Sequence, residues 1–345
     1  MSITEREILG QHEALSKTYE YFLANAGRIK KFADRQNYKS LAFIGCGSSY
    51  CQCRSAELSA KMRLPVPAVS IAGGDLMLNY PHYRNMLRGA MLITPTRSGA
   101  TSEVVLSVKK IKREQKAPLI LVCCRENSEL EEMAELALVI PWAFDQSACQ
   151  TRSVTSLYAA NLCLVAALAS DKALFREIGL AVKNQEKFMA ANRDALREIG
   201  GLGWTQAVVL ADSELEGIAG SAALSVKEIA LAPANYYHLL DVRHGPIVLI
   251  NDKTLVIMAA SPSGSNYQKD LVADLKKRGA TVVTFGPQAL GGDYHLAAPA
   301  YKNFGVAGIP FIFGPQLIAY YKAAARGLDP DQPRGLEPWI VLKKK

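Results

Sequence analysis

The sequence predicts an α/β protein that contains two copies of one unit, each a parallel sheet flanked by helices. The length of 345 residues corresponds to roughly two domains. Short apolar runs alternate along the chain with amphipathic stretches, as they do in parallel sheets covered by helices. In addition, segments of the first half recur in the second half at a nearly constant distance along the chain.

The expected strands of the first half are the apolar runs at residues 41–45, 68–71, 90–94, 119–123 and 137–140. A helical middle follows at 151–169 and 174–199, and further strands are expected at 207–211, 255–259 and 281–285. Residues 200–203 (GGLG) interrupt the pattern. We therefore expect an N-terminal domain over residues 1–200, with a leading helix and linking helices, and a C-terminal domain over residues 201–345.

Three pairs of segments carry the internal repeat. Residues 55–61 (SAELSAK) match 221–227 (SAALSVK) at five of seven positions, 166 residues apart. Residues 94–99 and 259–264 both end in Ser-Gly, 165 residues apart, and the apolar runs 117–122 and 280–285 lie 163 residues apart. Because the pairs occur in the same order and context, we infer two copies of one α/β unit, with a shared cleft as the natural place for a ligand.

Composition excludes several classes of protein. Hydrophobic residues make up 49% and charged residues 21%, which rules out wholesale disorder. No window holds 18 consecutive apolar residues and the N-terminus lacks an apolar signal core, so we expect a cytoplasmic protein with no membrane partner. Seven cysteines without an export signal do not suggest disulfides, and their spacing suggests no metal site.

The net charge of +8 favours small anionic ligands. The basic clusters at residues 28–31, 109–113, 276–278 and 343–345 are typical of solvated helix ends and of a solvated tail. No recognition helix or aromatic-basic motif accompanies them, so no nucleic acid partner is expected.

Two loops of small residues follow apolar strands of the first half. The first loop, residues 44–50 (IGCGSSY), and the second loop, residues 93–101 (ITPTRSGAT), each lead into a predicted helix. Glycine allows the backbone to approach an anion closely, and hydroxyls and the amides of a helix N-terminus donate hydrogen bonds to phosphate oxygens. The candidate ligand-binding residues are Gly47, Ser48, Ser49, Thr96, Arg97, Ser98 and Thr101.

Each loop alone could be an ordinary turn in which Ser98 or Thr101 caps the following helix. Two such loops at the carboxyl ends of parallel strands favour phosphate binding. Neither loop has the spacing GxGxxG or GxxxxGK[ST], so no nucleotide cofactor is expected.

A helix predicted over residues 215–231 carries a carboxylate beside apolar surface. Its main face is apolar at helical spacing, and Leu224 and Leu231 form a second, narrower stripe close to Glu228. A carboxylate beside covered apolar surface tends to have a raised pKa, which suits a general base near neutral pH. A solvated or ion-paired glutamate next to Lys227 is the commoner reason for such a pattern.

His244 lies in the segment 241–247 (DVRHGPI), directly before an expected strand that ends at Ile250. Gly245 and Pro246 predict a sharp turn that would hold the imidazole at the entrance of that strand. Beside Arg243, this histidine could be a proton shuttle or a ring-opening acid, and a plain surface histidine is the alternative.

Taken together, these motifs resemble the double sugar-isomerase (SIS) proteins, namely the isomerase half of glucosamine-6-phosphate synthase and its stand-alone relatives. The segments that carry the resemblance follow the family's order over nearly the whole chain: residues 5–8 with Gln11, 45–50, 96–101, 227–229, 243–246 and 329–333. The resemblance implies two flavodoxin-like SIS domains, each a parallel sheet flanked by helices, and a homodimer. It also implies that the loops with Ser49 and with Thr96, Ser98 and Thr101 hold the phosphate of a hexose 6-phosphate.

The same resemblance implies catalytic roles. Glu228 would move a proton between C1 and C2 through an enediol or enamine, and His244 would assist ring opening or protonate the departing group. In that family the histidine is often supplied across the dimer, which would explain the second apolar stripe beside Glu228. Arg152 stands where the family often has a lysine near the substrate.

The C-terminus departs from the family's pattern. In the synthase and the deaminases, a lysine that can form a Schiff base with the open-chain ketose follows Asp-x-Pro-x-x-Leu, whereas Pro338 stands at that place here. Because Met1 leads straight into the SIS region, glutamine-dependent amination is expected to be excluded for this chain.

The fructosamine-6-phosphate deglycases also lack that lysine and carry Arg-His-Gly-Pro, as residues 243–246 do here. The resemblance therefore favours a deglycase that acts on a hexose 6-phosphate conjugated to an amine, with Glu228 as the base. An aldose/ketose phosphosugar isomerase, an amino-sugar-6-phosphate deaminase and a non-catalytic sugar-phosphate sensor are the alternatives.

Overall fold

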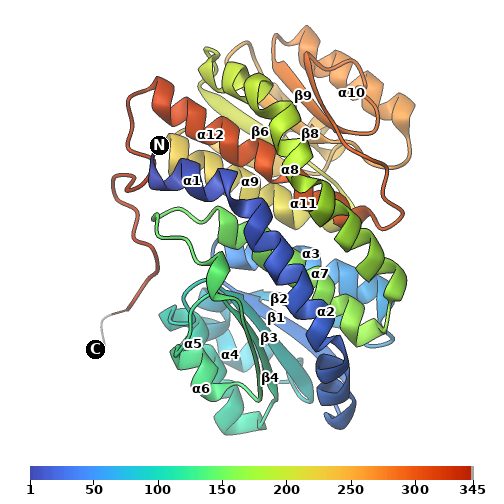
Figure 1. Cartoon of the computed structure of the whole chain (residues 1–345), viewed down its shortest axis with the longest axis vertical. Helices are drawn as coiled ribbons and strands as arrows, with labels where there is room; N and C mark the ends of the chain where they lie inside the picture. The colour runs from blue at the N-terminus through green and yellow to red at the C-terminus, as the bar shows by residue number, and fades with distance from the viewer. Residues whose placement is uncertain (343–345) are drawn as a thin grey trace. The chain divides into compact units, whose positions relative to one another are not determined.

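The computed structural model describes residues 1–342 and contains two five-stranded parallel sheets (Figure 1). The tail predicted to be solvated, residues 343–345, lies outside the described residues. The chain divides into two compact units. Unit N comprises residues 11–146, 152–179 and the segment from Glu337 onward, and unit C comprises residues 1–10, 147–151 and 180–336. The chain thus passes between the units several times, whereas the sequence predicts a single boundary at residue 200.

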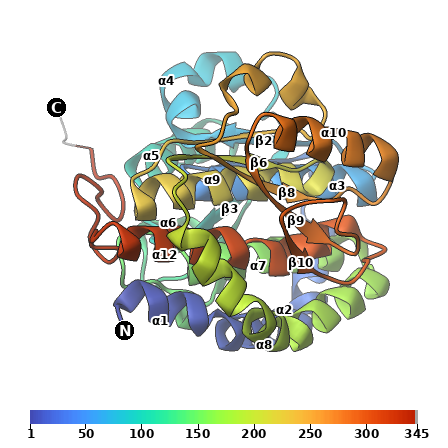
Figure 2. The same ribbon diagram turned by 90° about the horizontal axis from the view of Figure 1, so that it is seen from above.

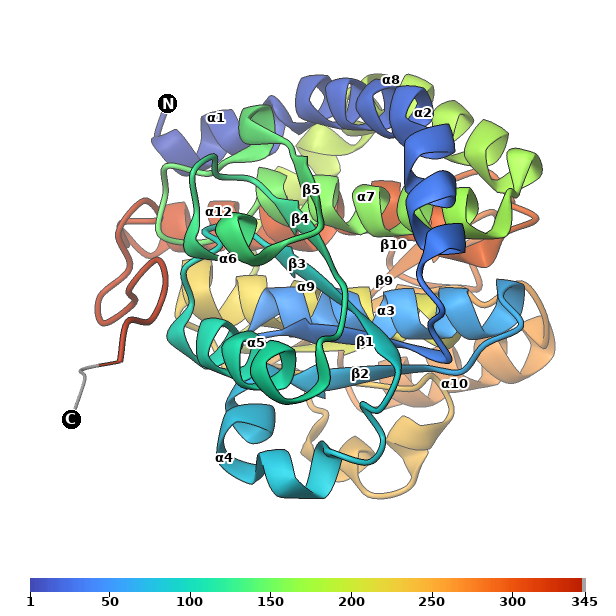
Figure 3. The same ribbon diagram turned by 90° about the horizontal axis from the view of Figure 1, so that it is seen from below.

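The sheet of unit N has the strand order β2-β1-β3-β4-β5, and Figure 3 shows its strands side by side. Its members are β1 (Ser40–Gly45), β2 (Ala68–Ala72), β3 (Ala90–Thr96), β4 (Leu119–Cys123) and β5 (Leu136–Val139). Every neighbouring pair is parallel, and Phe43 of β1 pairs with Ser70 of β2 and Ile93 of β3. The strand order reverses between β1 and β3, and ligands of such sheets bind at the carboxyl ends of the strands at this point.

Helices cover both faces of this sheet because its inner strands are apolar on both faces. One face, which includes Leu92 and Leu121, packs against α4 (Gly73–Tyr83), α5 (Ser102–Gln115) and the short α6 (Glu129–Met133). Helix α5 follows from its apolar residues at helical spacing, Val104, Val108 and Ile111. The other face packs against α3 (Ser48–Arg63) and α7 (Arg152–Ala169), and α2 (Gln11–Arg35) packs on α7.

The sheet of unit C repeats the topology of the first sheet. Its strands are β6 (Gln206–Leu210), β7 (Ala234–Tyr237), β8 (Thr254–Ala259), β9 (Thr281–Gly286) and β10 (Tyr294–Ala297). They lie in the order β7-β6-β8-β9-β10, which matches the order of the first sheet strand for strand. Figure 2 shows β8, β9 and β10 with α10 (Ser265–Lys277) close by. The internal repeat predicted from the sequence is therefore confirmed.

The helices of unit C are also divided between the two faces of its sheet. Helix α10 and the loop segments around Leu239 and Ile250 pack on the face that includes Val256. Helix α9 (Glu216–Ala230) packs on β6 and β7, and α12 (Phe313–Ala325) packs on α9. The remaining elements of this unit are α1 (Ile3–Leu9), which packs on α12, the short α11 (Gly308–Phe311), and most of α8 (Lys172–Gly201).

The structure differs from the predicted elements of the second half at three places. Strands β7 and β10 were not expected, since each has only four residues at an edge of the sheet and carries Asn, His or Tyr side chains. The strand predicted to follow His244 is wrong, because residues 246–249 form a 3₁₀ helix. Pro246 cannot donate to a sheet ladder, and Val248 and Leu249 are exposed instead of buried.

Two helical stretches are long and apolar enough to span a membrane by length and composition, α7 and residues 304–325. In both, 89% of the apolar window is buried inside the structure. Helix α7 is apolar on all sides because α2 and α3 both pack against it, which is the composition expected of a core helix.

Candidate functional site

The first loop starts at the carboxyl end of β1 and leads into α3. Gly47 is the N-cap residue of α3 and has a φ of 55°, a conformation that glycine adopts at little cost. A Cβ atom at Gly47 would meet nothing within 4 Å, so the backbone is open at this point. Ser48 and Ser49, the first residues of α3, are buried. Because Gly47 supplies no capping side chain, the positive end of the α3 dipole is left for an anion or solvent.

The second loop leads from β3 into α5. The side chains of Thr96, Arg97 and Ser98 are buried, and two of them fold the loop. The Gly99 amide donates to Thr96 Oγ1 at 3.1 Å, and the Ala100 amide donates to Ser98 Oγ at 3.2 Å. Each hydroxyl accepts in these bonds and keeps its own hydrogen for a further acceptor, such as a phosphate oxygen.

Thr101 is the N-cap residue of α5, as the alternative interpretation expects, but its side chain makes no capping hydrogen bond. Its backbone carbonyl accepts from the amides of Val104 and Val105 at 3.1 and 3.0 Å. The Thr101 hydroxyl therefore makes no capping hydrogen bond to the helix that Thr101 begins.

The two loops leave neighbouring strands at the same edge of the sheet. Strands β1 and β3 are directly paired, and neighbouring strands are spaced about 4.8 Å apart. Both loops follow the carboxyl ends of their strands, on either side of the point where the strand order reverses. The structure thus brings the Gly47–Ser49 loop and the Thr96–Thr101 loop together, as the sequence predicts.

Gly99 gives the second loop its sharp turn. Its φ is 62°, and a Cβ atom at this position would lie 2.3 Å from Ser128 Oγ and 2.4 Å from Ser128 Cβ. Ser128 begins α6 with a capping box that includes Glu131. The loop between β3 and α5 is thereby packed closely against the start of α6, and only glycine fits at position 99.

Arg152 begins α7 and is hydrogen-bonded to Phe144 and Asp145. Its guanidinium donates to the Phe144 carbonyl at 2.6 Å, and its own amide donates to Asp145 Oδ1 at 3.0 Å. The buried Asp145 also accepts from the Ser153 amide at 3.0 Å and from the Ser153 hydroxyl, so it caps α7.

Arg152 and Arg97 act on the same buried thiol. Burial raises the pKa of the Cys124 thiol well above its usual value, and the charges of Arg97 and Arg152 oppose this increase. The structure thus brings these two predicted site residues close to Cys124 in unit N. Burial likewise raises the pKa of Cys46, in the first loop, to about 11, with the nearby Glu103 carboxylate adding to the effect. Burial thus disfavours the thiolate form of both cysteines, which is the nucleophilic form.

The C-terminal segment of unit N lies against the second loop. The Arg97 guanidinium donates to the Pro338 carbonyl, the Ser102 amide donates to the Ile340 carbonyl at 3.2 Å, and the Leu342 amide donates to Ser102 Oγ at 3.0 Å. The Arg125 guanidinium lies 5.6 Å from the centre of the Trp339 ring. Pro338, at the position of the family's lysine, is thus joined to the loop through its carbonyl group.

Glu228 lies in unit C, in the last turn of α9. Its side chain is half-buried, whereas the neighbouring Lys227 is exposed. Of the second apolar stripe, Leu224 is half-buried and Leu231, which ends the helix with a φ of 47°, is 40% exposed. The stripe is therefore only partly covered within one chain.

His244 also lies in unit C and is exposed. It ends a short 3₁₀ helix, and its amide donates to the Asp241 carbonyl at 2.9 Å. Gly245, with a φ of 122°, makes the sharp turn that the sequence predicts. The Arg243 guanidinium forms an ion pair with Asp274, since its Nε and Nη2 donate to Asp274 Oδ2 at 3.0 and 2.6 Å.

Two of the segments that resemble the SIS proteins, residues 5–8 and 329–333, have a structural role in unit C. Asp331 accepts from the amides of Ile3 and Thr4 at 2.9 and 2.7 Å, so it caps the N-terminus of α1 from the far end of the chain. Glu5 accepts from the Tyr320 hydroxyl at 3.1 Å and pairs with Arg193 at 3.4 Å. These bonds attach α1 to the loop that follows α12, to α12 itself and to α8.

Asp145, Ser128 and Trp339 hold or lie beside the loops and helix that carry candidate site residues, but they were not predicted from the sequence. Asp145 precedes the start of α7 by seven residues, which is too far for the usual capping pattern in the sequence to indicate its role as a helix cap. Ser128 carries a capping-box signal, Ser followed by Glu three residues later, that was readable in the sequence. Trp339 lies next to Pro338, but nothing in the sequence indicates its contact with Arg125.

Residues 36–169 match the family model of the SIS domain. The curated glutamine–fructose-6-phosphate aminotransferase (isomerizing) of Vibrio parahaemolyticus is 25% identical to this chain, over 98% of this chain and 58% of the relative. The same enzyme of Chlamydia trachomatis is 25% identical over 88% of this chain and 52% of the relative. The chain therefore spans little more than half the length of these curated relatives.

Solved structures resemble almost the whole chain. A glucosamine-6-phosphate deaminase from Thermotoga maritima is 26% identical, with a TM-score of 0.82, over 99% of this chain and all of that chain. The tagatose-6-phosphate ketose/aldose isomerase of Escherichia coli is 22% identical, with a TM-score of 0.84, over 98% of both chains. The matched residues 36–169 include the whole sheet of unit N, so the SIS domain model describes this unit, and the sheet of unit C repeats its strand order.

Proposed function

We propose that the chain binds a hexose 6-phosphate, or its amine conjugate, and catalyses proton transfer between C1 and C2 of the sugar. The observation that carries this proposal is the pair of hydroxyl-bearing loops at the ends of β1 and β3, at the point where the strand order reverses. The SIS domain and the similar proteins, whose names all refer to sugar phosphates, support the same substrate class.

The phosphate group would lie between the two loops. Ser98 and Thr96 can each donate a hydrogen bond while they accept from the loop backbone, and Thr101 has a hydroxyl that its helix does not use. Ser48, Ser49 and the N-terminus of α3 would bind the phosphate from the neighbouring strand. Arg97 and Arg152 would add positive charge behind the loop, near Cys124.

Glu228 would act as the base in the reaction. In a ketosamine 6-phosphate, its carboxylate takes a proton from C1, which gives an enaminol, and a proton returned to C2 converts this species to an imine at C1. Water then adds to C1 and the amine departs, so that hexose 6-phosphate and free amine form without any external oxidant or reductant. His244 would protonate the departing nitrogen or the ring oxygen.

The deglycase is favoured among the possible reactions because no lysine stands at position 338 to form a Schiff base with the ketose. The segment Arg243-His-Gly-Pro246 adds the motif of that branch, although Arg243 itself pairs with Asp274 and supplies no charge to His244 in this arrangement. These two features support a substrate that already carries its amine.

An amino-sugar-6-phosphate deaminase is the second candidate. The Thermotoga maritima protein described as a glucosamine-6-phosphate deaminase is 26% identical and matches the full length of this chain. In that case Glu228 would shift the proton from C2 to C1 and the amine would leave C2, with the same two catalytic residues.

The proposal includes a homodimer in the cytoplasm. Leu231, Leu240, Val248 and Leu249 of unit C are all at least 40% exposed, and the last two lie just beyond His244 in the chain. Exposed apolar side chains of this kind are what an interface between two copies would cover.

Proton NMR with three substrates separates the candidate reactions. A fructosamine 6-phosphate conjugate, glucosamine 6-phosphate and fructose 6-phosphate are each incubated with wild type, with Glu228→Gln and with the neighbouring control variant Lys227→Gln. Release of amine and hexose 6-phosphate from the conjugate alone, lost in Glu228→Gln and kept in Lys227→Gln, would establish the deglycase. Turnover of glucosamine 6-phosphate or fructose 6-phosphate alone would assign the deaminase or the isomerase.

Absence of turnover with all three compounds would distinguish a sugar-phosphate sensor from an enzyme. If all three compounds bind saturably but none is turned over, and binding is unchanged in Glu228→Gln, the chain is a sugar-phosphate sensor and the catalytic role of Glu228 is refuted.

A further inference from the structure

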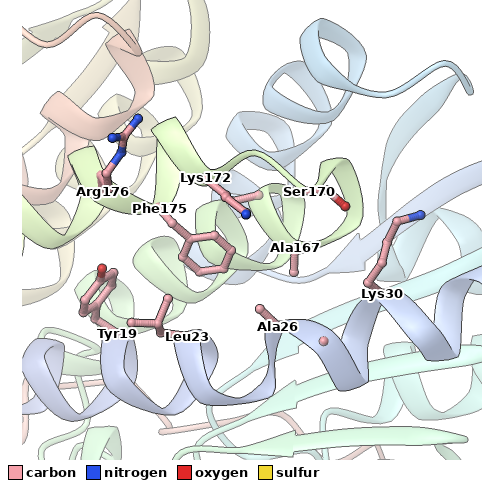
Figure 4. Close-up of a pocket in the computed structure, with 11 residues that line it drawn as sticks. Tyr19, Leu23, Ala26, Lys30, Ala167, Ser170, Lys172, Phe175 and Arg176 are labelled. Atoms are coloured by element: carbon pink, nitrogen blue, oxygen red, sulfur yellow. The ribbon is translucent and has the colours of Figure 1, made fainter.

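A pocket in unit N lies between α2, the C-terminal end of α7 and the start of α8. Its volume is about 700 Å³, which is within the range of pockets that bind small molecules. Its apolar wall consists of side chains from these three helices, and Figure 4 shows the Phe175 ring reaching into the space beside Ala167 and Ala26. The lining residues with apolar side chains or rings are Tyr19, Leu23, Ala26, Ala166, Ala167 and Phe175.

The wall of this pocket is preformed. Tyr19 is held by close packing on α8, because a Cβ atom at Gly179 would lie 2.6 Å from the Tyr19 hydroxyl. Phe175 and Ala167 are buried, whereas Leu23 is 49% exposed at the edge of the pocket. An exposed leucine beside buried apolar residues offers surface that an apolar ligand would cover.

The charges around the pocket all have one sign. Lys30, Lys172 and Arg176 line it, and none of the residues that line it is acidic. Lys30 pairs with Asp34 on the same helix, whereas Lys172 and Arg176 have no carboxylate partner within residues 1–342. Two cationic side chains beside an apolar pocket are complementary to a ligand that has an acidic head and an apolar body.

The pocket is separate from the candidate sugar-phosphate site. Arg152, at the candidate site, begins α7, whereas Ala166, Ala167 and Ser170 lie at or just beyond the other end of this 18-residue helix. A helix of that length spans about 27 Å. A ligand in the pocket would therefore not touch the loops that follow β1 and β3.

We propose that this pocket binds a small amphipathic carboxylate, whose apolar body lies against Phe175, Tyr19 and Ala167 and whose carboxylate pairs with Lys172 and Arg176. The proposal does not rest on the proposed reaction, because it uses none of the residues assigned to the sugar phosphate.

Isothermal titration calorimetry with decanoate as the probe tests the proposal. We expect decanoate to bind one site per chain, and 1-decanol, which lacks the charge, to bind about tenfold more weakly or not at all. The double variant Lys172→Glu/Arg176→Glu should weaken decanoate binding by about tenfold or more, because both residues are exposed and the change reverses the charge. Lys183→Glu, an exposed charge reversal on α8 outside the pocket, should bind decanoate as wild type does.

A variant that fills the pocket gives an independent test. Ala26→Trp on the outer helix α2 should abolish decanoate binding, and its thermal unfolding midpoint should stay within a few degrees of wild type. Saturating hexose 6-phosphate should leave decanoate binding unchanged, so a failure of the proposed sugar reaction would not affect this result.

Three outcomes would overturn the proposal. These are equal affinity for decanoate and 1-decanol, unchanged decanoate affinity in the double variant, and an absence of binding at millimolar decanoate. If a second copy of the chain occupies the pocket instead, decanoate will not bind, and Ala26→Trp will lower the mass measured by light scattering.

Discussion

At the scale of single residues, the second loop is held by contacts that leave its hydroxyl hydrogens for a ligand. Thr96 and Ser98 accept hydrogen bonds from the loop backbone, and Gly99 allows the turn that makes those bonds possible. Gly99 and Gly47 have almost the same φ, 62° and 55°, but only Gly99 is in contact with another element. A side chain at Gly47 would therefore cause only backbone strain, whereas a side chain at Gly99 would cause backbone strain and a steric clash.

Gly99→Ala should therefore destabilise the protein more than Gly47→Ala. We expect a loss of about 3 kcal/mol at position 99, where a positive φ and a clash with Ser128 combine, and about 1 kcal/mol at position 47, where only the φ matters. Urea unfolding measures both losses. Ser128→Gly, which keeps a residue tolerated at an N-cap, should restore part of the loss in the double variant, and equal losses at positions 47 and 99 would contradict this explanation.

Glu228→Gln should reduce kcat by about a thousandfold and change KM only slightly. A glutamine keeps the shape and the hydrogen bonding of the residue but cannot take a proton, and general base catalysis contributes about 10²–10⁴-fold. Steady-state kinetics on the preferred substrate measure this effect. A parallel loss in kcat and in substrate affinity would instead indicate a role in binding.

At the scale of elements, residues far apart in sequence hold the helix ends that position the site. Asp145 caps α7 and so fixes the start of the helix that carries Arg152. Asp331 caps α1 in the same way. Burial would raise the pKa of Asp331, but hydrogen bonds from the amides of Thr4 and Ile3 outweigh it, so the pKa is lowered.

The lowered pKa of Asp331 gives a pH dependence with a defined sign. The stabilisation is fully present above the ordinary pKa of an aspartate, about 4, and is lost as the pH falls from there through the lowered pKa of the folded state. Asp331→Asn should cost about 1 kcal/mol at pH 7 and little at about pH 2. Chemical unfolding of both proteins across this range checks the prediction, and a cost independent of pH would contradict it.

The elements that could be predicted from the sequence are those with strong apolar patterns. Strands β1, β3, β4 and β8 are inner strands, buried on both faces, and their apolar runs identify them. Edge strands β7 and β10 are short and partly polar, so their formation depends on the neighbouring strand and not on their own sequence. The apolar run after His244 includes Val248 and Leu249, which are exposed in the structure. The spacing of apolar residues in the sequence does not indicate this exposure.

The candidate site was predictable to a similar degree. The glycines and hydroxyls of the two loops are local features, and the sequence indicates them together with their position after strands. Two contacts were not predictable: the hydrogen bond from Arg97 to the Pro338 carbonyl, 241 residues away, and the cation–π contact of Arg125 with Trp339. Both depend on where the C-terminal segment lies, which no local sequence pattern indicates.

At the scale of the whole molecule, the protein is two copies of one flavodoxin-type topology, and the candidate residues are divided between them. The two loops proposed to bind the phosphate and Arg152 belong to unit N, and Glu228 and His244 belong to unit C. The duplication gives each sheet a point where the strand order reverses, and the loops proposed to bind the phosphate lie at that of unit N.

The proposed homodimer predicts complementation between inactive variants. If His244 serves a site in the partner subunit, a mixture of Glu228→Gln and His244→Gln chains should recover activity, because each hybrid dimer holds one site with both native residues. An equal mixture should reach about a quarter of wild-type activity, since half of the dimers are hybrid and half of their sites are intact. Activity assays after mixing by mild denaturation and refolding measure this, and complete absence of recovery would place both residues in one chain's site.

We propose that Glu228 moves a proton at C1 or C2 of a hexose 6-phosphate, whichever reaction follows. Deuterium incorporation tests this role, because a proton held by the carboxylate can exchange with solvent before it is returned to the sugar. The sugar phosphate or ketosamine phosphate that turns over is incubated in deuterium oxide, and the loss of its C1 and C2 proton signals is followed by NMR. We expect exchange catalysed by wild type and by Lys227→Gln, and exchange about a thousandfold slower in Glu228→Gln. Equal exchange rates in wild type and Glu228→Gln would contradict the claim.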